Sequence, residues 1–115
     1  TPIEKNITVK NEVDYLISFV EVERELANVR ISEINDSMEK EKQKQSMLEQ
    51  EIEELKADAL YQTDSEQVTT QTAINDKTEQ IRQSELAIED LIFDMEEARE
   101  KIDKLKQKES DLLKK

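Results

Sequence analysis

The sequence contains no glycine, and its only proline is Pro2. These two residues end helices most often, because glycine costs about 1 kcal/mol and proline about 3 kcal/mol in a helix interior relative to alanine. Most globular domains also need glycine at turns with a positive φ. The absence of both residues predicts long helices and favours one continuous helix over a compact globular domain.

Histidine and cysteine are absent as well, and aromatic residues make up only 3% of the chain. Without cysteine the chain has no disulfide framework and no thiol chemistry. Without glycine it has neither a glycine-rich phosphate loop nor a calcium-binding loop of the common kind. The 29 carboxylates are spread along a solvated surface rather than gathered in a pocket. We therefore predict that the chain is not an enzyme and binds neither a metal nor a cofactor.

The formal net charge of -12 opposes binding to nucleic acid and to anionic membranes, because both depend on clustered lysine and arginine. No apolar run reaches the roughly 18 residues of a membrane span, and no signal peptide is visible. The expected partners are proteins, with no nucleic acid and no membrane. The expected location is intracellular, in the cytoplasm or on the cytoskeleton.

Charged residues make up 40% and hydrophobic residues 35% of the chain, a composition shared by disordered segments and coiled coils. The aliphatic residues recur at spacings of three and four, which favours a coiled coil. One heptad frame covers residues 13–61 and a second covers residues 74–113. Isoleucine at position a with leucine at position d, as in the second frame, favours a parallel two-stranded coil. The predicted dimer seam consists of Ile17, Val20, Ile31, Ile34, Met38, Leu48, Ile52, Leu55, Ile74, Ile81, Ile88, Leu91, Met95, Ile102 and Leu105.

The two frames are offset by one residue, and residues 62–73 between them form a weak segment whose only large aliphatic residue is Val68. We favour a one-residue skip within a continuous helix, which local unwinding of the supercoil absorbs. The alternative is a helical hairpin, with Gln62 to Thr72 as its loop and a capping box from Thr63 to Glu66 opening a second helix. The missing glycine counts against that alternative. Residues 1–12 are left as an uncommitted lead-in, since their β-branched residues allow an extended or irregular segment and Pro2 is consistent with the first turn of a helix or with no helix.

A second apolar stripe accompanies the seam near the N-terminal end, at spacings of four, three, four and three. Because two residues correspond to about 200° of helical rotation, it lies on roughly the opposite face of the helix from the seam. Soluble proteins rarely leave such a patch uncovered. We expect either other copies of the chain or a helix of another protein to cover it. The stripe consists of Tyr15, Phe19, Val22, Leu26 and Val29.

A smaller patch runs from Leu86 to Phe93, where Ala87 and Ile92 occupy g and e positions. Apolar e and g positions are typical of coiled coils with more than two helices. The patch could pair with the second apolar stripe, either between copies of the chain or within a hairpin.

Six polar residues interrupt the predicted seam, and each lowers stability locally. A polar residue at a or d is tolerated when it is paired or hydrated, and it can fix the register and the number of helices. Gln45 fits that register role best. The six residues are Arg24, Glu41, Gln45, Lys77, Ser84 and Glu109.

Three charge pairs between g and e positions, Lys44 with Glu49, Glu51 with Lys56 and Asp94 with Arg99, would attract in a parallel dimer. The exception is near the C-terminal end, where Lys101 would face Lys106 of the other chain and repel it.

These features predict an all-α, long coiled coil that forms a parallel homodimer, with an N-terminal part able to form a higher-order helical bundle or tetramer. Its predicted function is that of an oligomerisation and spacer segment of a larger scaffold, tether or motor-type protein, with a docking surface for another protein's helix at Tyr15 to Val29. The alternative is an antiparallel helical hairpin that acts as a binding arm or clamp.

Overall fold

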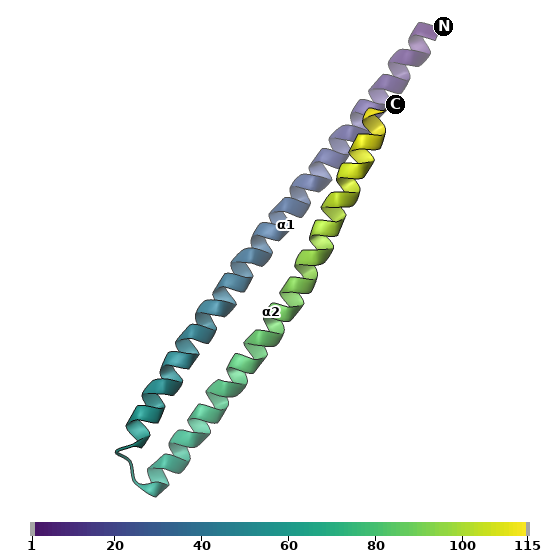
Figure 1. Cartoon of the computed structure of the whole chain (residues 1–115). Helices are drawn as coiled ribbons and strands as arrows, with labels where there is room; N and C mark the ends of the chain where they lie inside the picture. The colour runs from purple at the N-terminus through teal and green to yellow at the C-terminus, as the bar shows by residue number, and fades with distance from the viewer. Residues whose placement is uncertain (1, 115) are drawn as a thin grey trace. The chain divides into compact units, whose positions relative to one another are not determined.

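The computed structural model describes the backbone of residues 2–114 and the side chains of residues 11–114. It contains two long helices, α1 from Pro2 to Ala59 and α2 from Asp64 to Leu113 (Figure 1). Pro2 lies in the first turn of α1, where the missing N–H of proline removes no helical hydrogen bond. Within the described backbone, the predicted all-helical fold is confirmed. Residues 2–12, for which the sequence left helix and irregular structure open, begin α1, and Thr1 lies outside the described residues.

The chain divides into two compact units, each built from one part of each helix. The first unit contains α1 as far as Ile34 and α2 from Asp94 onwards. The second unit contains residues Asn35–Phe93, including the connection between the helices.

In the first unit, α1 and α2 pack as an antiparallel pair. Glu23 lies 3.4 Å from the Nζ atom of Lys101, and Arg30 lies 3.6 Å from a carboxylate oxygen of Asp94. From Glu23 to Arg30 the residue numbers rise along α1, whereas those of their partners on α2 fall from Lys101 to Asp94. The two segments therefore run in opposite directions.

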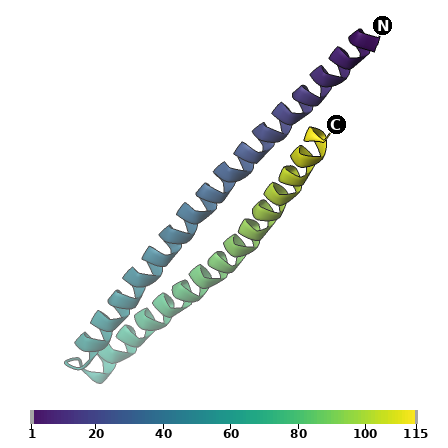
Figure 2. The same ribbon diagram turned by 45° about the horizontal axis from the view of Figure 1, so that its top comes forward.

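The second unit is a helical hairpin. The Ser84 hydroxyl donates to the carboxylate of Glu41 at 2.5 Å, and Lys77 donates to the carboxylate of Glu51 at 2.7 Å. The order of these pairs again shows antiparallel packing, and Figures 1 and 2 both show the turn that joins the two helices.

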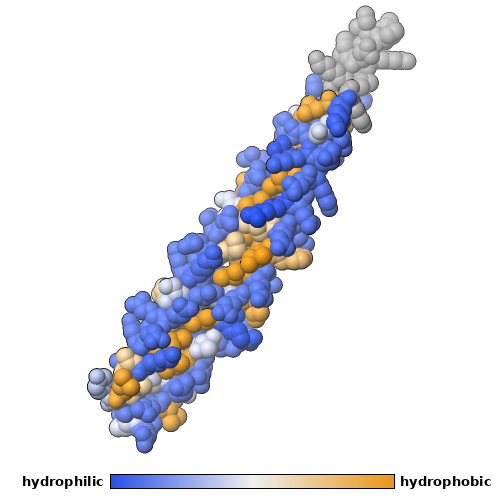
Figure 3. Space-filling view, viewed as in Figure 1, coloured by the Kyte–Doolittle hydropathy of each residue, from blue (hydrophilic) through white to orange (hydrophobic). Residues whose placement is uncertain are grey.

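Aliphatic side chains between the two helices form the interior of both units. Val20 and Ile34 have no exposed surface, and every residue of the predicted seam is buried or half-buried. Hydrophobic residues reach the surface as narrow strips between hydrophilic ones (Figure 3). The heptad pattern therefore identified the inward faces of the helices, and in this structure each face is covered by the other helix of the same chain. The buried apolar residues are Val20, Ala27, Ile34, Leu48, Ile52, Ile74, Met95, Ala98 and Leu112.

The favoured continuous helix is wrong, because the helix is interrupted at residues 60–63 and the chain reverses there. The one-residue offset between the heptad frames marks this turn. The first frame belongs to α1 and the second to α2, so no skip has to be absorbed within a helix. The hairpin alternative described the connection correctly, although its loop is shorter than predicted, since α2 already begins at Asp64.

The turn closes without glycine, because no described residue adopts a positive φ. The N–H groups of Leu60, Tyr61 and Gln62 donate to carbonyls three residues earlier, at 3.1 to 3.3 Å, and tighten the end of α1. The side-chain amide of Gln67 donates to the carbonyl oxygen of Ala59 at 2.8 Å. A side chain from α2 thus adds a second donor to the Ala59 carbonyl, which also accepts from the N–H of Gln62, near the helix end where a glycine motif often supplies the donors.

The start of α2 is capped by Thr63, as the hairpin alternative predicted. The hydroxyl oxygen of Thr63 accepts from the backbone N–H of Glu66 at 3.3 Å, and the hydroxyl donates to the carboxylate of Glu66 at 3.0 Å. In the usual capping box the glutamate accepts from the backbone N–H of the cap residue, so this arrangement is a variant of it. The Thr70 hydroxyl also donates to the Gln62 side chain at 2.5 Å and ties the turn to the first part of α2.

Candidate protein-docking surface

The second apolar stripe lies on α1 in the first unit and is uncovered. The exposed fraction of its five side chains ranges from 47% at Val29 to 73% at Tyr15. On the opposite face of the same helix segment, Val20 and Ile34 are fully buried against α2. Helix α2 covers the seam and leaves most of the stripe exposed.

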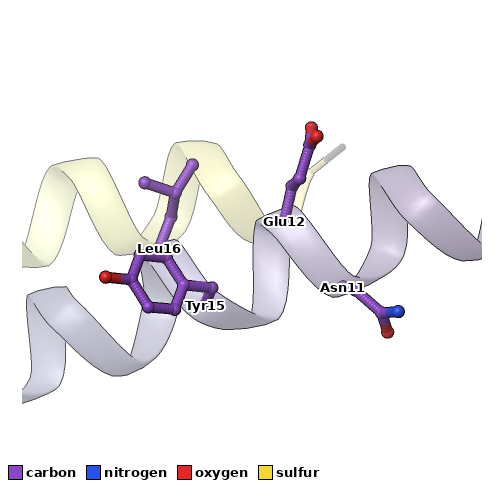
Figure 4. Close-up of a pocket in the computed structure, with 4 residues that line it drawn as sticks. All are labelled: Asn11, Glu12, Tyr15 and Leu16. Atoms are coloured by element: carbon purple, nitrogen blue, oxygen red, sulfur yellow. The ribbon is translucent and has the colours of Figure 1, made fainter.

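A shallow hollow opens at the N-terminal end of the stripe, lined by Asn11, Glu12, Tyr15 and Leu16. Figure 4 shows Asn11 and Glu12 pointing in opposite directions, one turn before Tyr15 and Leu16. Leu16 is 40% exposed and adds apolar surface beside Tyr15. Leu16 was not predicted to belong to the stripe, although its g position in the first heptad frame places it at the edge of the seam.

A second hollow lies beside Leu26, in the groove between the two helices of the first unit. Leu26, Ala27 and Arg30 line it from α1, and Glu97 and Lys101 are among the residues that line it from α2. The residues on the α2 side were not predicted, because their contribution depends on antiparallel pairing. The stripe therefore continues at Leu26 into a groove with charged walls.

Carboxylates surround the second apolar stripe. Glu12 precedes Tyr15 by one turn, and Glu33 follows Val29 by one turn. Both are exposed, as are Glu21 and Glu25. Along one side of the stripe lie Glu21 and Glu25, one turn apart. The border of the stripe is consequently rich in negative charge.

The two arginines of the same segment are already engaged within the chain. Arg24 forms a salt bridge and hydrogen bond with Glu109. Arg30 contacts Asp94 at 3.6 Å and Glu33 at 3.9 Å. The positive charges nearest the stripe are thus partly neutralised by carboxylates of the same unit.

Polar residues of the predicted seam form a small network in the second unit. Ser84, which is 2% exposed, donates to the carboxylate of Glu41 at 2.5 Å and accepts from the side-chain amide of Gln45 at 3.1 Å. The small serine at a d position leaves room for the longer glutamate and glutamine opposite. Such a network is specific to one alignment of the two helices, and a register role for Gln45 remains a prediction.

The remaining polar seam residues also find partners within their own unit. Lys77 pairs with Glu51 at 2.7 Å in the second unit, and Arg24 pairs with Glu109 in the first. Among the described side chains, no buried polar atom lacks a hydrogen-bond partner. Lys101, which would face Lys106 of the other chain in a parallel dimer, lies 3.4 Å from Glu23 of its own chain.

The patch from Leu86 to Phe93 forms a separate apolar surface in the second unit. Leu86, Ile92 and Phe93 are each exposed by 42% or more, whereas Ala87 is half-buried. The patch is shorter than the second apolar stripe and includes fewer exposed apolar side chains.

One titratable group on α2 departs clearly from its ordinary value. The pKa of Glu79 is lowered from 4.5 to about 2, chiefly because Arg82 donates hydrogen bonds to its carboxylate, with a further hydrogen bond from Gln83. The side chain is exposed, so this pair has no pocket around it. The pKa shift reflects local pairing along a helix surface, not a catalytic environment.

In the described part of the chain, no group of three or more acidic, histidine or cysteine side chains is arranged to hold a metal ion. Neither helix contains, within the same part, an apolar stretch that could cross a bilayer. Comparison of the sequence and the structure with protein-family models, curated proteins and solved structures gives no match.

Proposed function

We propose that the chain is a protein-interaction segment, a binding arm in which an antiparallel helix pair presents the second apolar stripe to a helix of another protein. One observation supports this function above the others. The helix segment 13–34 carries two apolar faces, and the structure covers only one of them. An exposed apolar stripe of this length is typical of an interaction site on a soluble protein.

The spacing of the stripe matches the geometry of helix recognition. Its residues recur at four, three, four and three, the spacing with which one helix packs against another. Tyr15 and Phe19 contribute aromatic surface, which is enriched among the residues that dominate binding energies. A partner helix lying along α1 would cover the stripe and reach both hollows of the first unit.

Oligomerisation and spacing within a larger scaffold, tether or motor-type protein remain proposals as well. In this structure the seam predicted to join two parallel chains is occupied by the chain's own second helix. Assembly of several copies would therefore use surfaces outside the seam, or it would require the helix pairs to open.

Selection from a display library of amphipathic helices tests the proposed function. The library keeps an apolar stripe and randomises the flanking residues, so it does not impose any charge on the binder. We expect selected helices to bind the full chain and to lose binding when Phe19→Glu and Leu26→Glu are introduced together.

The matched control is Leu60→Glu with Val68→Glu, which introduces the same charges at two exposed apolar residues of the second unit. This control should retain binding. Selected helices that bind the stripe variant and the control equally well would contradict a docking surface at Tyr15 to Val29.

A further inference from the structure

The charge around the second apolar stripe defines the chemistry of its partner. We infer that the stripe takes a basic amphipathic helix, with lysine or arginine on the borders of its own apolar face, from a protein other than a second copy of this chain. This inference rests on the proposed function, because it assumes that a helix docks on the stripe.

The border of the stripe is acidic. Exposed carboxylates stand at both ends, at Glu12 and Glu33, and along one side, at Glu21 and Glu25. Charges at the rim of a helix–helix contact face the rim of the partner helix, as e and g residues do in coiled coils. A partner with basic borders would meet these carboxylates with attraction along most of the contact.

The other side of the stripe faces α2. There Glu23 is paired with Lys101 at 3.4 Å, and Arg30 is held between Asp94 and Glu33. Because the positive groups on this side already have acidic partners, they offer little attraction to an acidic helix. This side therefore does not oppose a basic partner, and the carboxylates at the ends and along the other side favour one.

A second copy of the chain is a less favourable partner for the stripe than a basic helix. If two stripes packed on each other, the carboxylates of Glu21 and Glu25 would border the contact on both copies. Like charges across an interface disfavour association, and the formal charge of -12 per chain adds to the repulsion. A basic helix from another protein removes this conflict, so the charge pattern selects it over self-association.

Two synthetic helices test the inference directly on the full chain. Both are about 20 residues long, above the length at which isolated helices are marginal, and both carry the same leucine and isoleucine stripe. One has lysine and arginine on its borders and the other has glutamate. Fluorescence anisotropy measures the affinity of each helix at low salt and at about 1 M salt, where the Debye length falls to about 3 Å.

We expect the basic helix to bind at least about tenfold more tightly than the acidic helix at low salt, and the ratio to shrink at high salt. The variant Glu21→Lys with Glu25→Lys should lose this preference. The matched control, Glu96→Lys with Glu100→Lys, changes the net charge equally at two exposed positions of α2, also one turn apart, and should keep the preference.

The outcomes separate the partner's charge from the docking function. Equal, stripe-dependent binding of both helices would overturn the inference and leave the proposed function standing. An equal loss of preference in the variant and in its control would show general attraction to an acidic chain, and it too would overturn the inference. If neither helix binds, or if the chain dimerises through Phe19 and Leu26, both the inference and the proposed function fail.

Discussion

Two faces of the same helix segment, residues 13–34 of α1, have similar apolar content and different surroundings. On the inner face, Val20, Ala27 and Ile34 are buried against α2. On the outer face, the second apolar stripe is exposed along its whole length. The inner face is buried in the fold of the first unit, whereas the outer face stays about half or more exposed.

The apolar patterns of the inner and outer faces must be distinguished before a function is inferred, because only one of them is buried. Burying an aliphatic side chain contributes about 1.5 to 3 kcal/mol, and only the inner face receives that contribution within the chain. The outer face would gain it on binding a partner. Substitutions on the two faces should therefore affect different measurements.

The largest expected effect is on stability, from Ile34→Ala on the inner face. Removal of this fully buried side chain should lower the free energy of unfolding by about 2 to 4 kcal/mol, through lost burial and a cavity. Phe19→Ala on the outer face should change it by less than about 1 kcal/mol. Urea denaturation followed by circular dichroism measures both. Equal losses would mean that the outer face is also packed in the folded chain.

The next effect concerns the polar network on the inner faces of the second unit. Ser84→Ala should lower the free energy of unfolding by about 1 to 3 kcal/mol, because it leaves the Glu41 carboxylate and the Gln45 amide without their shared partner. Ser32→Ala, at an exposed position of α1, is the control and should have almost no effect. Thermal melts measure the stability of the two variants. Equal melting temperatures would show that the Ser84 network does not stabilise the fold.

A smaller effect is expected at the turn. Gln67→Ala removes the amide that donates to the carbonyl oxygen of Ala59, and it should lower stability by about 0.5 to 1 kcal/mol. Gln43→Ala, at an exposed position within α1, provides the comparison. Hydrogen exchange near residues 60–63 should accelerate in the first variant alone. Unchanged exchange there would show that the glycine-free turn does not depend on this contact.

The smallest effect is the pH dependence that arises from Glu79. Because its pKa is depressed in the folded state, to about 2 from 4.5, its contribution to stability is present above pH 4.5 and is lost as the pH falls toward 2. The contribution is small, since the pair is exposed and screened by solvent. In Arg82→Ala, NMR titration should show the pKa of Glu79 moving back toward 4.5. An unmoved pKa would contradict the assigned cause.

The sequence predicted the helical content correctly, and aliphatics that it assigned to a dimer seam by their three- and four-residue spacing, such as Val20, Ile34 and Ile52, are buried in the structure. It did not identify what covers them. A heptad seam pairs equally well with a second chain or with another segment of the same chain. The contacts of Ser84 with Glu41 and Gln45 depend on the antiparallel alignment of the two helices, which the heptad pattern does not specify.

The turn was misjudged for a related reason. The absence of glycine suggested a continuous helix, because many helices end with glycine in the left-handed conformation. Here the end of α1 is tightened by hydrogen bonds to carbonyls three residues earlier, and Gln67 and Thr63 supply side-chain caps. These contacts use common polar residues, which composition alone cannot distinguish from surface positions. The position of the second apolar stripe was predicted from its spacing, and its partner remains a prediction.

The most direct test of the account is whether the inner faces of the two helices meet within one chain. The sequence lacks cysteine, so a single introduced pair, Glu41→Cys with Ser84→Cys, reports on one contact without background. A short thiol cross-linker should join the pair within one chain, at the mass of 13.5 kDa, and Ile52→Cys alone should give no symmetric bridge between chains. Efficient bridging between chains through Ile52→Cys, with no intrachain product from the pair, would contradict the antiparallel fold. It would indicate that the seam joins two parallel chains.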